Sequence, residues 1–85
     1  MKTTFEKFHL LGGGDGVLGD IGGCDLWHLT VGGLNVPLGA RTAWALAVDP
    51  FPHAWRVTIT LAGASVPIWF DVSEDAAMRI ERLAG

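Results

Sequence analysis

Three glycines near the N-terminus have the spacing of a nucleotide-binding motif. Gly14, Gly16 and Gly19 follow the G-x-G-x-x-G pattern, in which backbone amides approach a pyrophosphate. The pattern requires a helix directly after it, because the N-terminus of that helix receives the phosphate charge. This chain instead continues Asp-Ile-Gly-Gly at 20–23, a run that breaks helices. We therefore expect no nucleotide site and interpret residues 12–23 as a glycine-rich loop, long enough to contact a partner.

Three aspartates recur at intervals of five residues through this segment and could offer oxygen ligands to calcium: Asp15, Asp20 and Asp25. However, the ligand spacing of an EF-hand is absent, and one such segment is not an array of calcium-binding repeats. A small-ligand or metal-binding domain that uses the glycine-rich loop remains an alternative function. We expect no cofactor and no metal, and we assign Asp15 and Asp20 to a partner-binding role on the loop.

One cysteine and three histidines could in principle hold zinc: Cys24, His9, His28 and His53. Cys24 and His28 are close in sequence, yet on an extended segment they would lie about 13 Å apart, too far to share a metal. The same distance excludes a Cys–His nucleophile pair, which needs hydrogen-bond reach. The adjacent acids Glu74 and Asp75 are explained by their place at a helix start. We therefore predict a protein that is not an enzyme.

The composition of the 85-residue chain fits one small domain, residues 1–85, with one core. Apolar residues make up 49% and charged residues 18%, which excludes intrinsic disorder. The net charge of −3 and the scattered basic residues argue against nucleic-acid binding. A single cysteine suits the reducing cytoplasm, and we find no signal peptide and no membrane span. The apolar surplus for so small an interior suggests a homo-oligomer.

The clearest structural signal is a β-hairpin around Gly32-Gly33, a dipeptide that accepts the positive φ angles of a type I′ turn. A two-residue turn there places six apolar side chains on one face: Trp27, Leu29, Val31, Leu34, Val36 and Leu38. Residues 3–11 are also expected to form a strand. Residues 42–48 alternate like a strand although their alanines favour helix, and we predict a strand with Trp44 facing inward. The prolines in 49–53 indicate a turn or loop.

A second hairpin is predicted from Trp55 to Val72. Pairing Leu61 with Val66 across a loop at 62–65 gives one wholly apolar face, which ends in the pair Trp55–Val72. The opposite face then carries Thr58 beside Trp69, and Arg56 beside Asp71 as an ion pair. Pro67 falls where it removes no ladder hydrogen bond.

The chain ends in a predicted helix at about 73–84, with Ser73 as its N-cap. Asp75 and Arg79 form an i,i+4 pair, and an apolar stripe should cover the sheet: Ala76, Ala77, Ile80, Leu83 and Ala84. The sequence therefore predicts a mainly β, α+β fold. It is a small antiparallel sheet or partly open barrel of five to six strands, with one C-terminal helix packed on it.

Trp69 is the candidate functional residue, because the register of the second hairpin turns it away from the core. An exposed tryptophan beside an arginine is typical of binding hot spots. We therefore predict a protein-binding surface made of Trp69, Arg56, Asp71, Thr58 and Pro67, with Asp15 and Asp20 on the loop. Small size, acidity and the absence of a catalytic constellation suit an accessory or inhibitory protein that binds another protein, and its size and lack of a motif suggest the phage type. The alternative is a structural subunit of a homo-oligomer that buries Trp69.

Overall fold

The computed structural model describes residues 4–20, 27–38, 44–63 and 66–84. These residues form seven strands and one helix, in the chain order β1 Thr4–His9, β2 Asp15–Asp20, β3 Trp27–Val31, β4 Leu34–Pro37, β5 Trp44–Phe51, β6 Ala54–Leu61, β7 Ile68–Val72 and α1 Glu74–Ala84. The predicted mainly β, α+β fold with one C-terminal helix is confirmed. The fold has seven strands in two sheets, which is more than the five or six strands expected.

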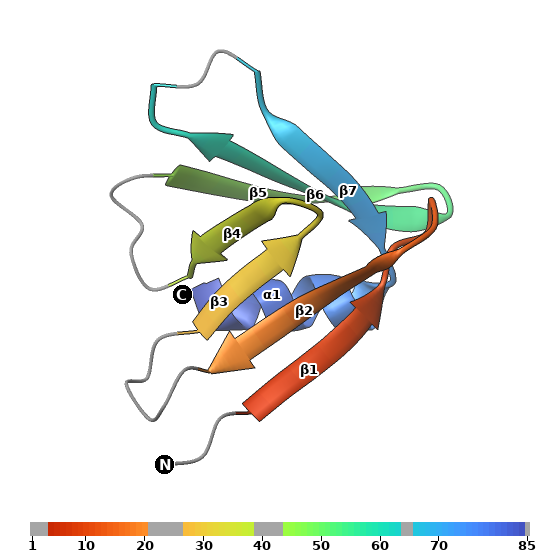
Figure 1. Cartoon of the computed structure of the whole chain (residues 1–85). Coiled ribbons are helices and arrows are strands. Elements are labelled where there is room, and N and C mark those ends of the chain that lie inside the picture. The colour runs from red at the N-terminus through yellow and green to blue at the C-terminus, as the bar shows by residue number, and fades with distance from the viewer. Residues whose placement is uncertain (1–3, 21–26, 39–43, 64–65, 85) are drawn as a thin grey trace.

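The strands form two antiparallel sheets, one in the order β1-β2-β3-β4 and the other in the order β5-β6-β7 (Figure 1). Hydrogen bonds between described residues join the sheets at their edges. The Leu11 amide donates to the carbonyl of Asp71 at 2.9 Å, and Trp44 Nε1 donates to the carbonyl of Pro37 at 3.1 Å. In Figure 1 the helix passes behind β2 and β3, and it packs against β6. Both sheets and the helix therefore enclose one core.

Both predicted hairpin registers are confirmed. Val31 pairs with Leu34 and Leu29 with Val36 around the first turn, while Arg56 pairs with Asp71 in the second hairpin. The first turn has a positive φ at Gly32, +59°, and none at Gly33. That pattern belongs to a type II′ turn and not to the type I′ turn that we expected.

The glycine-rich segment corrects our prediction, because its residues 15–20 form a strand and not a loop. β2 lies between β1 and β3 and pairs with both. The ring of Phe8 lies over Gly16, and Leu18 is only 2% exposed, so pairing and burial overcome the weak strand preference of glycine. The turn before β2 has positive φ at Gly13 and Gly14. Residues 21–23 of the predicted loop, and Cys24, lie outside the described residues.

The predicted strand at 42–48 is confirmed from residue 44, and it continues through 49–51, where we expected a turn or loop. Only Pro52 and His53 form the turn, and Phe51 pairs with Ala54. Pro50 is tolerated inside the strand because it pairs with Trp55 at a position without ladder hydrogen bonds, next to the hydrogen-bonded pair that closes the turn.

The paired part of the second hairpin is shorter than predicted at the end near its connecting loop. The ladder between β6 and β7 ends at Ile59 and Ile68, and Val66 lies before β7 instead of pairing with Leu61. Val66 is 72% exposed and Ile68 is 38% exposed, so the predicted apolar face is buried only over its inner part. Pro67 between them donates no backbone hydrogen bond, which is consistent with a ladder that ends here.

The helix begins after Ser73, whose Oγ accepts a hydrogen bond from the Ala76 amide at 3.3 Å, so the predicted N-cap is confirmed. Ala77, Ile80 and Ala84 are buried in the core. Its other buried members come from both sheets: Phe8, Leu18, Leu29, Val36, Leu38, Trp44, Val57, Ile59, Phe70 and Val72. Within the described part of the chain, no helix is long and apolar enough to cross a membrane.

Candidate protein-binding surface

The three-stranded sheet turns one face to the core and the other outward. Its register places Asp49, Arg56 and Asp71 in one row across β5, β6 and β7. Thr58 and Trp69 lie side by side in the next row. We call the outward side chains of these rows, together with Phe51, the aromatic face.

Arg56 is held at the centre of the aromatic face by three side chains. Its Nε and Nη2 donate to the two carboxylate oxygens of Asp71, at 2.8 and 3.0 Å. Its guanidinium carbon lies 3.9 Å from the ring centroid of Trp69 and 4.4 Å from that of Phe51. The hydrogen bonds from Arg56 lower the pKa of the Asp71 carboxyl below its usual range. A bidentate, stacked arginine has little freedom left to lose on binding.

The two aromatic side chains of this face remain open to solvent. Trp69 is 55% exposed and Phe51 is 45% exposed, although each contacts the Arg56 guanidinium. The structure thus places Trp69 outward, as the hairpin register predicted. A contact between Trp69 and a partner stays a prediction.

The remaining predicted residues of this sheet are distributed around Trp69. Thr58 pairs with Trp69 and is half-buried, while Pro67 is exposed just before β7. Val66 and Ile68 flank Pro67 and are exposed as well. Ile68 lies on the core-facing side of β7, opposite to Trp69, so these exposed apolar side chains are not part of the aromatic face.

Asp15 and Asp20 do not join this surface, because they lie on β2 in the other sheet. Asp15 accepts a hydrogen bond from His9 Nδ1 at 2.8 Å. Asp20 has a buried carboxylate oxygen, Oδ1, that finds no hydrogen-bond partner among the described residues. The structure therefore separates the two predicted loop residues from the aromatic face.

Sequence analysis missed Phe51 and Asp49, which belong to the aromatic face. Both belong to residues 49–53, where the prolines predict a turn or loop. The signal that could have found them is the alternation that continues past residue 48, since every second residue from Ala45 to Phe51 points outward. Asp49 is exposed and forms no ion pair with any described residue, so it leaves a negative charge on this face.

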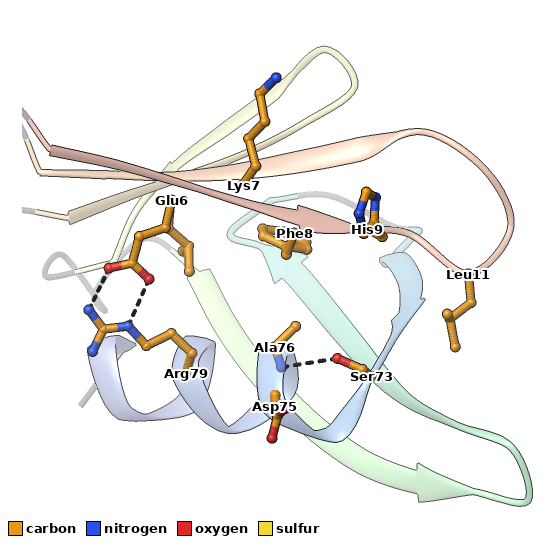
Figure 2. A pocket seen from close by; sticks show the side chains of 10 residues that line it. Glu6, Lys7, Phe8, His9, Leu11, Ser73, Asp75, Ala76 and Arg79 are labelled. Carbon is orange, nitrogen blue, oxygen red and sulfur yellow. Dashed lines mark hydrogen bonds and ion pairs between the residues drawn. The ribbon is translucent and has the colours of Figure 1, made fainter.

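A concave feature separate from the aromatic face lies between β1 and α1. It is an open cavity of about 470 Å³. Figure 2 shows Glu6 and Phe8 pointing from β1 toward the helix, and Ala76 and Ser73 on the opposite wall. Leu18 and Leu11 add apolar lining. We call this feature the β1–α1 groove.

An ion pair bridges the β1–α1 groove at one end. Arg79 Nε and Nη2 donate to the Glu6 carboxylate at 3.0 and 2.6 Å (Figure 2). These hydrogen bonds lower the pKa of Glu6 below its usual range. The Arg79 guanidinium also lies 5.3 Å from the ring centroid of Trp27. Arg79 thus connects the helix to β1 and β3, and the ion pair that we predicted with Asp75 is not formed.

The candidate metal ligands do not converge in the part of the chain that can be described. No group of three His, Cys, Asp or Glu side chains there could hold a metal ion. His28 donates from Nδ1 to Asn35 Oδ1 at 2.9 Å, and His53 lies exposed in the turn between β5 and β6. Cys24 lies outside the described residues, so our expectation that it neither binds zinc nor forms a nucleophile pair with His28 stays a prediction.

The glycines of the nucleotide-binding pattern also lack the context that the motif needs. Gly16 and Gly19 lie within β2, paired with β1 on one side and β3 on the other. They do not open a helix, which is where a pyrophosphate would bind. That this chain binds no nucleotide stays a prediction.

The chain was compared with protein families, with curated proteins and with solved structures. No protein-family model matches it, and no curated protein does. No solved structure matches it either. What the aromatic face and the β1–α1 groove can bind therefore follows from their own residues and geometry.

Proposed function

We propose that this chain is a non-enzymatic protein-binding module and that its aromatic face contacts the partner. The observation that carries the proposal is the fixed stack of Trp69 and Phe51 around Arg56, exposed on the outer side of the three-stranded sheet. Tryptophan and arginine are enriched among residues that dominate binding energy. Small size and acidity suit an accessory or inhibitory role of phage type in the cytoplasm.

Rigidity of the stack supports this role. Binding normally costs the entropy of ordering long side chains at the interface. Here Asp71 already orders Arg56, and Arg56 supports both rings, so a partner would meet a preformed surface. The half-buried Thr58 beside Trp69 adds a hydroxyl at the edge of the ring.

The charges on the aromatic face indicate which side chains a partner's surface should carry. The row across the three strands holds two carboxylates, Asp49 and Asp71, and one guanidinium, Arg56. Its net charge is negative, and Asp49 has no ion-pair partner in the described residues. The complementary surface therefore combines an apolar patch for Trp69 and Phe51 with a lysine or arginine near Asp49.

The decisive variant is Trp69→Ala. We expect it to weaken association by at least about 2 kcal/mol, or roughly thirtyfold in Kd, because the exposed ring contributes to binding and little to the core. The matched control is Phe5→Ala, which removes another exposed aromatic side chain, 66% exposed, from the other sheet. Proteins retained by the immobilised wild type from a cytoplasmic extract are compared with those retained by each variant, and Kd is then measured with the purified partner.

Loss of one retained protein with Trp69→Ala and its retention with Phe5→Ala would support the proposal. Sedimentation of the purified chain tests a second copy of the chain as the partner, since the same face would then hold a homo-oligomer together. The melting temperature of dilute protein separates folding from binding. If Trp69→Ala unfolds the dilute monomer while association per folded molecule is unchanged, Trp69 is a core residue and this surface is not an interface.

A further inference from the structure

β1 is an edge strand whose outer side offers unpaired backbone groups. The sheet order ends at β1, and the described residues include no strand on its outer side. The Leu10 amide donates to the Gly14 carbonyl at 3.0 Å, and hydrogen-bonded pairs alternate with non-bonded pairs from there along the ladder. Phe8 and Glu6 therefore direct their backbone groups to β2. Phe5, Lys7 and His9 direct theirs outward.

The β1–α1 groove runs beside these outward backbone groups. Its strand wall consists of residues 6–9, and its helix wall includes Ala76 and Arg79. The inner part is apolar, because Phe8 and Leu18 are buried there and Ala76 is a small side chain (Figure 2). A strand added to β1 would place every second side chain toward this apolar lining.

The opposite side of the same edge carries the positive charge of Lys7. In Figure 2 the Lys7 side chain points away from the helix, on the reverse side of β1 from Phe8. Lys7 is exposed and forms no ion pair with any described residue. An added strand would therefore gain from an acidic side chain directly opposite Lys7.

We propose that an extended segment of a partner protein binds along β1 as an additional strand, with apolar side chains in the β1–α1 groove and an acidic side chain opposite Lys7. The hydrogen bonds from Phe5, Lys7 and His9 supply affinity that does not depend on sequence. The groove and Lys7 select for alternating apolar and acidic residues. This site is separate from the aromatic face.

Charge argues against two of the registers in which a second copy of the chain could pair at this edge. Two copies of β1 that pair about an axis at Lys7 place two lysines directly opposite each other. An axis at Glu6 places two carboxylates opposite each other. Like charges in such pairs are destabilising, whereas an acidic strand is complementary to Lys7.

The test uses the full chain and a blocked peptide of alternating glutamate and valine, about seven residues long. Isothermal titration should show binding of this peptide, and a peptide of alternating lysine and valine should bind at least about tenfold more weakly. Backbone amide shifts in NMR spectra should change along residues 5–9 on binding. If the acidic peptide does not bind, or if both peptides bind equally, the proposal is wrong.

Two variants at one position separate the backbone from the side chain. Lys7→Pro removes the outward amide but no hydrogen bond to β2, so the fold should remain, as a thermal melt will show. Lys7→Ala removes the charge and keeps the amide. We expect Lys7→Pro to bind the acidic peptide at least about tenfold more weakly than Lys7→Ala does. Equal affinities of the two folded variants would overturn strand addition.

The groove is tested by Ala76→Leu, which fills it from the helix wall. We expect this variant to remain folded and to lose at least about tenfold in affinity for the acidic peptide, because the added side chain occupies the space of a valine. Trp69→Ala should bind the peptide as the wild type does, since it changes the other surface. Unchanged binding to Ala76→Leu would show that the peptide does not use the groove. Weaker binding to Trp69→Ala would show that it uses the aromatic face instead.

Discussion

Gly16 is required at its position because the Phe8 side chain occupies the space above it. A Cβ built on Gly16 would lie 2.1 Å from the Phe8 ring, and that ring is itself buried with its centroid 6.1 Å from that of Phe70. The ring therefore covers the glycine, and neither can change without the other. This packing, and not backbone freedom or a nucleotide, explains why a glycine stands in the middle of β2.

Gly16→Ala should lower the free energy of unfolding by about 1–3 kcal/mol, because the added methyl group forces the Phe8 ring out of its site. Gly12→Ala is the matched control, since its Cβ would meet no atom within 4 Å and its φ is not positive. Urea denaturation of both variants measures the difference. Equal stability of the two variants would mean that Phe8 does not lie over Gly16, and the register between β1 and β2 would then be wrong.

The central pairs of the aromatic face could be predicted residue by residue, because they follow from one register. Once Trp55 faces Val72, Arg56 must face Asp71 and Thr58 must face Trp69. The stacking of Phe51 on Arg56 could not be predicted in this way, since it joins β5 to β6 through a turn whose position the two prolines concealed.

At the scale of elements, the hairpins and the helix were predictable, and β2 was not. Hairpins and helix carry local signals, such as a two-residue turn, alternation of apolar residues, and an N-cap followed by an apolar stripe. β2 carries two glycines, Gly16 and Gly19, on either side of its apolar pair, and three more glycines at 12–14 precede it. Its strand conformation depends on pairing with β1 and β3, which is information from distant parts of the chain. The partner of Arg79 was missed for the same reason, because Glu6 lies at the other end of the chain.

The helix should contribute to stability mainly through Ile80, which is 0% exposed and lies among core residues of both sheets. Ile80→Ala is expected to lower the free energy of unfolding by about 2–5 kcal/mol, since it removes buried methyl groups and leaves a cavity. Glu81→Ala, on the exposed side of the same turn, is the control and should change stability by less than about 0.5 kcal/mol. Denaturant titration of the two variants measures both changes in the free energy of unfolding. A neutral Ile80→Ala would show that the helix does not cover the core.

At the scale of the whole molecule, one core unites two sheets that share few edge hydrogen bonds. Leu18 and Leu29 of the four-stranded sheet, Val57 and Ile59 of the three-stranded sheet, and Ile80 of the helix are each at most 2% exposed in the same cluster. Neither sheet could bury its inner face alone. The aromatic face and the β1–α1 groove are therefore two surfaces on a common support.

That shared core predicts cooperative unfolding of both sheets. Tryptophan fluorescence reports mostly on the three-stranded sheet, which carries Trp44, Trp55 and Trp69, whereas far-UV circular dichroism reports on all strands and the helix. We expect the two signals to give the same urea midpoint. Leu29→Ala, in the four-stranded sheet, should lower both midpoints together by an amount equivalent to about 2–5 kcal/mol, because the side chain is fully buried against the other sheet's cluster. Asn35→Ala, on the exposed side of the same hairpin, is the control. If Leu29→Ala shifts the dichroism midpoint and leaves the fluorescence midpoint in place, the sheets unfold separately and the core does not unite them.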